Sequence, residues 1–178
     1  MRRYVLGMLV AALAISVSGG DLESTLSADR PEDRAILGYL ELAKAKQASA
    51  ADLTELGVLL AGSNRLADAE HWLRKAVRAD RHSFAAWYRL GLVQQRQGRS
   101  HDAAATFARA LRERPDDGYA RFMLALAEER CGNGSAAVAS YARAFQALPD
   151  LADPRHNPLV LDSRLQTEAG LRYYRERV

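Results

Sequence analysis

The sequence predicts an all-α fold in which antiparallel pairs of helices stack side by side into a solenoid. Three observations lead to this prediction. Residues of the same size recur every 34 positions, and a period of about 20–50 residues is typical of repeat architectures. Each period contains two stretches with the hydrophobic periodicity of amphipathic helices. Short turn signals containing glycine separate the two stretches in each period.

Aligned small and bulky residues define the register. The first helix of each period carries a leucine followed by a small residue, and the second carries a small, a bulky and a small residue. Glycine inside a helix costs about 1 kcal/mol relative to alanine, so we interpret these small residues as places where paired helices approach closely. The members are Leu56-Gly57, Leu90-Gly91 and Leu124-Ala125, followed by Ala69, Leu73 and Ala76, by Ala103, Phe107 and Ala110, and by Ala137, Tyr141 and Ala144.

This pattern resembles the tetratricopeptide repeat. The period 84–117 carries the family's pattern best, and the periods 50–83 and 118–151 depart from it, with Leu53 and Arg121 in place of the usual tryptophan. The residues that carry the resemblance are Trp87, Leu90, Gly91, Ala103, Phe107, Ala110 and Pro115. The resemblance implies a right-handed superhelix of three tetratricopeptide units, with the first helix of each unit lining the concave face.

Additional helices are expected at both ends of the three units. Ala35 and Tyr39 lie one repeat period before Ala69 and Leu73, so residues 31–49 are expected to form an N-terminal half-unit after a linker at 21–30. Beyond residue 151 the pattern of small and bulky residues does not recur at the 34-residue spacing. Residues 152–178 are expected to form a loop and a C-terminal capping helix, since solenoids need covered ends; the alternative is a separate docking element. An apolar stripe on one face of this helix would cover the end of the stack, and it consists of Leu161, Leu165, Ala169 and Tyr173.

The N-terminal residues 1–20 have the three parts of an export signal. Arg2 and Arg3 form a basic start, an uncharged apolar run follows, and small residues end the segment. Cleavage after Ser18 or Gly20 would give an exported protein, either periplasmic or secreted. The alternative is an uncleaved anchor in the inner membrane, since the segment just suffices to cross a thin bilayer.

Few residues suggest catalysis, metal binding or nucleic-acid binding. The formal net charge is +3, and two of these charges belong to the N-terminal arginines, so no nucleic-acid partner is expected. Cys131 is the single cysteine, and the four histidines lack the spacing of metal ligands. The sequence contains no glycine-rich phosphate loop and no nucleophile elbow. We therefore expect a protein that is not an enzyme and that has no cofactor or metal.

The candidate site is the expected concave surface of the second and third units. Residues there recur as an aromatic, a leucine, a polar residue and an arginine on one helical face, and a surface of this kind suits a peptide or helix with apolar and acidic residues. The expected partner-binding residues are Tyr88, Arg89, Leu92, Gln95 and Arg96 in the second unit and Tyr119, Phe122, Leu126, Glu129 and Arg130 in the third.

Alternative interpretations remain open for this surface and for the function. The alternative for Leu92 and Leu126 is that they simply pack between neighbouring helices. The lysine-and-asparagine clamp with which some tetratricopeptide proteins hold a chaperone's C-terminal carboxylate is absent. The leading hypothesis is an exported, non-enzymatic scaffold for protein–protein interaction. Its rivals are a membrane-tethered assembly factor and an accessory subunit of an enzyme complex.

Overall fold

The computed structural model describes residues 19–160 and 162–175, and within these ranges every regular element is helical. This confirms the predicted all-α class. The elements are α1 (Gly19–Ser24), α2 (Pro31–Lys44), α3 (Ala50–Gly62), α4 (Leu66–Ala79), α5 (Phe84–Arg96), α6 (Ser100–Glu113), α7 (Gly118–Arg130), α8 (Gly134–Ala147) and α9 (Arg164–Arg175), with the short 3-10 helices η1 (Pro149–Ala152) and η2 (Pro158–Val160) before α9.

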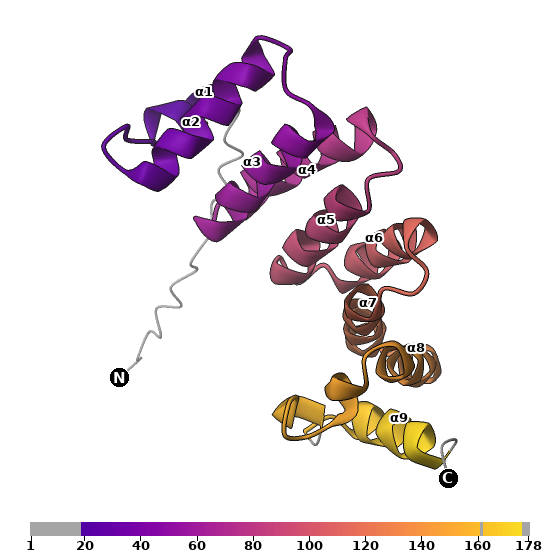
Figure 1. Cartoon of the computed structure of the whole chain (residues 1–178). Coiled ribbons are helices and arrows are strands. Elements are labelled where there is room, and N and C mark those ends of the chain that lie inside the picture. Colours follow the sequence, from indigo (N-terminus) through magenta and orange to yellow (C-terminus); the bar gives the residue numbers. More distant parts are fainter. Residues whose placement is uncertain (1–18, 161, 176–178) are drawn as a thin grey trace, which may run out of the picture.

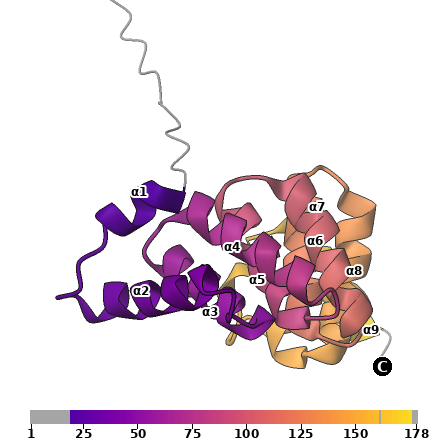
Figure 2. The ribbon, with the colours of Figure 1, turned by 90° about the horizontal axis from the view of Figure 1, so that it is seen from above.

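The helices form antiparallel pairs that follow one another along a curved stack (Figure 1). The pairs are α3–α4, α5–α6 and α7–α8, and each lies within one of the three expected repeat units. Seen from above, the ribbon runs from α1 and α2 at one end to α8 and α9 at the other (Figure 2). The first helices of successive pairs contact one another, α3 with α5 and α5 with α7, whereas the second helices make no contact of that extent. The first helices therefore lie on the inner side of the curve.

Each helix pair is joined by a turn whose backbone requires a special residue. Asn64, Gly98 and Gly132, which occupy the same position of successive repeats, have φ values of 59°, 77° and 78°. This left-handed conformation is costly for most side chains and is readily adopted by glycine and asparagine. The first helices of the following units begin at side-chain caps, because Ser83 and Asp117 accept hydrogen bonds from backbone N–H groups three residues later. These local signals set the helix boundaries.

The glycines of the first helices mark the closest approach between paired helices. A Cβ atom built on Gly91 would lie 2.6 Å from Cε1 of Phe107, and one built on Gly57 would lie 2.5 Å from Cγ of Leu73. Both of these partner side chains are fully buried. Because the helices are packed to van der Waals contact, no larger side chain fits at either glycine. The sequence-based interpretation of Gly91 as a packing residue is confirmed.

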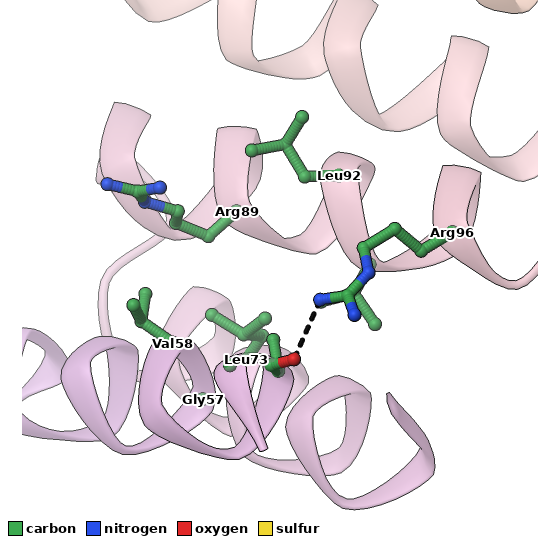
Figure 3. Close-up of a pocket in the computed structure, with 9 residues that line it drawn as sticks. Gly57, Val58, Leu73, Arg89, Leu92 and Arg96 are labelled. Atoms are coloured by element: carbon green, nitrogen blue, oxygen red, sulfur yellow. Dashed lines mark hydrogen bonds between the residues drawn. The ribbon is translucent and has the colours of Figure 1, made fainter. Parts of the chain in front are cut away.

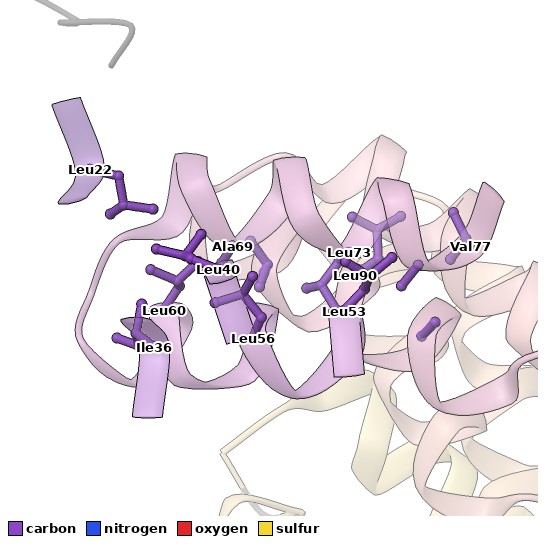
Figure 4. Close-up of a cluster of buried hydrophobic side chains, with 13 residues drawn as sticks. Leu22, Ile36, Leu40, Leu53, Leu56, Leu60, Ala69, Leu73, Val77 and Leu90 are labelled. Carbon is purple, nitrogen blue, oxygen red and sulfur yellow. The ribbon is translucent and has the colours of Figure 1, made fainter. Parts of the chain in front are cut away.

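The N-terminal region differs from the expected linker at residues 21–30. Gly19–Ser24 form α1, and Leu22 is only 1% exposed because it packs with Ile36, Leu40 and Leu60 in the first core cluster (Figure 4). Leu22 lies one repeat period before Leu56, so the repeat register extends further back than the sequence interpretation placed it. The expected export signal falls almost entirely on residues 1–18, outside the described residues. Within the described ranges, no helix is both long and apolar enough to span a bilayer.

Helix α9 covers the C-terminal end of the stack by packing on α8. Ala169 and Tyr173 of the predicted stripe are buried, and Leu165 is half-buried; Leu161 lies outside the described residues. The capping helix was predicted, but its sequence register was overlooked. Ala169 and Gly170 repeat the order of Leu124 and Ala125, an apolar residue followed by a small one, beyond a connection lengthened by η1 and η2. Helix α9 therefore repeats the pattern of a first helix after more than one repeat period.

A hydrogen-bond network attaches α9 to the third unit. The hydroxyl groups of Tyr141 and Ser163 donate to the two carboxylate oxygens of Glu129 over 2.6 Å and 2.7 Å. The side-chain amide of Gln166 donates to the Tyr141 hydroxyl oxygen over 3.3 Å. Burial raises the pKa of Tyr141, and the bond to Glu129 raises it further. The phenol therefore remains a proton donor, and α7, α8 and α9 are joined through one carboxylate.

The close helix contact predicts the effect of enlarging Gly91. We expect Gly91→Leu to lower the free energy of unfolding by about 1–3 kcal/mol, because overpacking forces the paired helices apart. Chemical denaturation followed by circular dichroism measures the change. The matched control is Gly62→Leu, since a Cβ there meets no atom within 4 Å. Equal stability of the two variants would show that the contact at Gly91 does not constrain the packing.

The network around Glu129 predicts a local effect at the C-terminal end. We expect Glu129→Ala to lower the free energy of unfolding by about 1–3 kcal/mol, since the Tyr141 and Ser163 hydroxyl groups lose their acceptor. Amide hydrogen exchange should become faster in α9 than in α3, because the loss lies between α9 and the third unit. The control is Arg130→Ala at the exposed neighbouring position. Unchanged exchange in α9 would refute this role of the carboxylate.

Candidate functional site

A hollow lies between the first helices of the first two units, on the inner side of the stack (Figure 3). Its volume is about 260 Å³. Apolar and small residues form most of its lining, and two arginines of α5 complete it. The lining residues are Gly57, Val58, Ala61, Gly62, Leu73, Arg89, Leu92, Val93 and Arg96. The hollow exists because α3 presents only small side chains where α5 carries larger ones.

The two arginines of the hollow have different surroundings. Arg96 donates to the backbone carbonyl of Ala61 over 2.7 Å and to the side-chain oxygen of Asn64 over 3.3 Å, so it crosses from the second unit to the first (Figure 3). Arg89 is exposed and makes no ion pair within the described part of the chain. The rim of the hollow is therefore positive, with one fixed and one available guanidinium group.

Tyr88 of α5 and Tyr119 of α7 are tyrosines of the predicted site that do not line the hollow. The Tyr88 ring stacks on Phe84 at 5.7 Å between centroids and lies 5.9 Å from Phe107, which leaves it half-buried. Burial raises the pKa of the Tyr88 hydroxyl, and the nearby carboxylate of Asp117 adds to the shift. Tyr119 is 58% exposed. Tyr88 is thus a neutral, partly fixed ring, whereas Tyr119 presents its ring to solvent.

The expectation that Phe122 faces the groove is wrong. Phe122 is 9% exposed, and its ring lies 5.3 Å from Tyr141 and 6.5 Å from Phe145. The physical reason is the packing of the third unit, because the Tyr141 and Phe145 rings of α8 enclose this side chain. The equivalent Thr54 is buried as well. Phe122 is therefore a core residue of the third unit.

The remaining predicted residues of the third unit do not form one surface with the hollow. The carboxylate of Glu129 is occupied by the network that holds α9. Leu126 is half-buried against the C-terminal core cluster, while Arg130 is exposed. Leu92 combines both interpretations, because it packs near Phe107 and also lines the hollow. Gln95 is half-buried beside it on α5 and does not line the hollow.

Residues of the first unit were missing from the predicted site. Gly57, Val58 and Ala61 form one wall of the hollow, and Leu73 of α4 contributes to its lining. The sequence signal was available in their small size, because absent side chains create the space that a ligand would fill. No group of three or more histidine, cysteine, aspartate or glutamate residues in the described ranges is arranged to hold a metal ion.

Comparisons with known proteins agree with this architecture. The sequence pattern of the tetratricopeptide repeat family matches residues 54–99 and 88–152, more than half of the chain. No curated protein sequence matches the chain. The solved structure of the MamA protein is similar at a TM-score of 0.68 and 24% identity, covering 88% of this chain and 85% of that one.

Two further solved structures share the fold. MamA from Desulfovibrio magneticus RS-1, from residue 41 to its end, has a TM-score of 0.67 at 16% identity and covers 88% of this chain and 93% of its own. YrrB, described as a tetratricopeptide repeat protein with an unusual peptide-binding site, has a TM-score of 0.65 at 20% identity and covers 86% and 79%. The chain belongs to the tetratricopeptide repeat family.

Proposed function

We propose that this protein is a non-enzymatic scaffold that binds a segment of another protein on its concave face, at the hollow between α3 and α5. The observation that carries the proposal is the combination of an apolar floor with two arginines on its rim. Protein-binding sites of this type use apolar pockets for affinity and a few charged groups for orientation. The peptide-binding site that names YrrB belongs to a structure with the same fold and supports a peptide as the ligand class.

The spacing of the arginines defines the preferred ligand. Arg89 and Arg96 are seven residues apart on α5, which corresponds to about 10 Å along the helix axis. An extended peptide advances about 3.3 Å per residue and its alternate side chains share one face, so carboxylates four positions apart lie about 13 Å apart on one face, within reach of both long arginine side chains. An apolar side chain between them would enter the hollow beside Val58 and Leu92. The proposed ligand is a segment with two acidic residues flanking an apolar one.

The fixed position of Arg96 supports its part in this recognition. A guanidinium group has five N–H donors, and Arg96 uses two of its nitrogens on Ala61 and Asn64. Its remaining donors stay available for a carboxylate at no further cost in side-chain entropy, since the group is already held. Arg89 has no such restraint and would adjust to the second carboxylate.

We further propose that the protein acts outside the cytoplasm. The support is the basic, apolar and small-residue order of residues 1–20. A membrane-tethered assembly factor is the second candidate, favoured by the length of the apolar run.

Intact mass spectrometry of the protein recovered from the exported fraction distinguishes the two locations. We expect a mass that lacks residues 1–18 or 1–20, because small residues end the segment where a signal peptidase would cleave. A mass that includes Met1 would contradict cleavage and favour the anchored form. Recovery in the cytoplasmic fraction alone would contradict both.

The proposed ligand chemistry predicts a charge-dependent affinity. Fluorescence anisotropy would compare peptides carrying two acidic residues four positions apart around a central leucine with peptides carrying lysines at those positions. We expect only the acidic peptides to bind, and Arg89→Glu to weaken binding about tenfold, mainly by slowing association. The loss should shrink at high salt, because exposed charges are screened.

Two further variants distinguish binding of the peptide in the hollow from a general effect of the protein's charge. Val58→Phe should weaken binding without changing the net charge, because its ring would occupy the hollow. Arg112→Glu makes the same charge change as Arg89→Glu on the exposed side of α6 and should leave the affinity unchanged. Equal binding of acidic and basic peptides, or equal effects of the two charge reversals, would overturn the proposal.

A further inference from the structure

One place in the repeat is filled in the second unit and open in the third. In the second unit, the indole Nε1–H of Trp87 donates to the backbone carbonyl of Arg81 over 2.9 Å, and Arg109 of α6 donates to the same carbonyl over 3.2 Å. The Arg109 guanidinium group also lies 5.6 Å from the centroid of the Trp87 ring. An aromatic ring and a guanidinium group therefore fill the place where the connection between units meets α5 and α6.

A carboxylate neutralises the arginine at this place in the second unit. Glu113 of α6 pairs with Arg109 over 2.9 Å and lies 3.0 Å from Nδ1 of His82. The Glu113 side chain is only 17% exposed, so the ion pair is partly shielded from water. The chain thus provides both the guanidinium group and its anion here.

The third unit lacks the ring and the carboxylate. One repeat period later, the tryptophan position is occupied by Arg121, the glutamate position by Ala147, and the arginine is kept as Arg143. Arg121 replaces the tryptophan as a donor, since its guanidinium group bonds to the backbone carbonyl of Pro115. A pocket of about 520 Å³ is left at this place. The residues that line this arginine pocket are Pro115, Asp116, Arg121, Arg143, Gln146 and Ala147.

The two arginines of the pocket have no anion of their own. Arg121 is half-buried and Arg143 is exposed, and neither forms an ion pair within the described part of the chain, not even with Asp116 of the same lining. Arg143 is also the sole charged residue of α8. The planar fork of N–H donors on a guanidinium group matches the two oxygens of a carboxylate. The arginine pocket is therefore suited to a carboxylate that comes from another molecule.

A smaller hollow continues the arginine pocket toward α9. Its volume is about 170 Å³, and its lining residues are Ala139, Ala142, Arg143, Gln146 and Arg172. Arg143 and Gln146 belong to both linings. A chain that places a carboxylate in the arginine pocket would cross α8 over its alanines toward an arginine of α9.

We propose that the arginine pocket is a second site for a partner protein, where it binds the carboxylate of an acidic side chain. The carboxylate would lie between Arg121 and Arg143, as the glutamate of the second unit lies against its arginine. The acidic segment that carries it would continue along the smaller hollow. This site shares no residue with the hollow between α3 and α5, so it does not depend on the ligand proposed there.

Fluorescence anisotropy with a labelled hexaglutamate peptide at low salt tests this site. All proteins carry Arg89→Glu, which suppresses binding at the hollow between α3 and α5. We expect Ala147→Glu to weaken binding about tenfold, because its carboxylate would pair with the arginines as Glu113 does in the second unit. The matched control is Ala136→Glu, which makes the same change at an exposed position of α8 about 16 Å along the helix. It should leave the affinity nearly unchanged.

Two changes in the lining test the pocket without adding a carboxylate. Arg143→Ala should weaken binding about as much as Ala147→Glu does. Asp116→Asn should strengthen binding about twofold, because it removes the like charge of the lining. Equal affinities of the Ala147→Glu and Ala136→Glu proteins would overturn the proposal, and so would unchanged binding by Arg143→Ala or weaker binding by Asp116→Asn.

Nuclear magnetic resonance of the arginine Nε–H groups locates the bound peptide. We expect hexaglutamate to shift the signals of Arg121 and Arg143 and to leave that of Arg112 on α6 in place. The absence of shifts at both pocket arginines with the peptide at about 1 mM overturns the proposal. Shifts caused by inorganic phosphate and not by the peptide overturn the assignment of a carboxylate.

Discussion

The structure depends on the distance between the two helices of each pair. At Gly57 and Gly91 the backbone of the first helix touches the bulky side chain of the second, and this contact buries Leu73 and Phe107 completely. A glycine inside a helix is unfavourable by itself, so the packing energy of the bulky partner has to exceed that cost. The pairs formed in this way then stack through their first helices, which sets the curvature and creates the inner surface.

The fold could be predicted from the sequence because its signals are local and repeated. Register, small residues and turn glycines recur with the same period, and each recurrence reinforces the others. The 34-residue repeat failed to identify helices only beyond the two ends of the three units, at α9 and at α1. Ala169 and Gly170 continue the pattern after the longer connection that contains η1 and η2, and a search at one fixed period does not find them. At the other end, Leu22 was assigned to a linker because its segment is too short to show periodicity.

The site was less predictable, because it depends on which way each side chain points. Tyr88 and Phe122 occupy equivalent positions, yet Phe122 is buried by the aromatic pair Tyr141 and Phe145, and only the three-dimensional packing reveals that difference. The hollow itself arises because α3 carries small side chains on this face. Gly57, Val58 and Ala61 drew no attention as binding residues, since a small side chain marks a site only when larger neighbours surround it. Of the arginines expected on the concave face, Arg89 and Arg96 line the hollow and Arg130 does not, and the bond from Arg96 to the preceding unit was not foreseen.

That bond gives the stack a mechanical property. In a solenoid each unit contacts only its neighbours, so the pitch is the sum of the angles at the individual joints. At the joint between the first two units, the Arg96 guanidinium group fastens α5 to the C-terminal end of α3 on the inner side of the curve. A fastening on the inside of a bend resists straightening more than it resists further closure. The joint between the first two units should therefore resist straightening more than closure, and the bonds from Gln97 to the Leu66 carbonyl and from Arg99 to Glu70 cross the same joint.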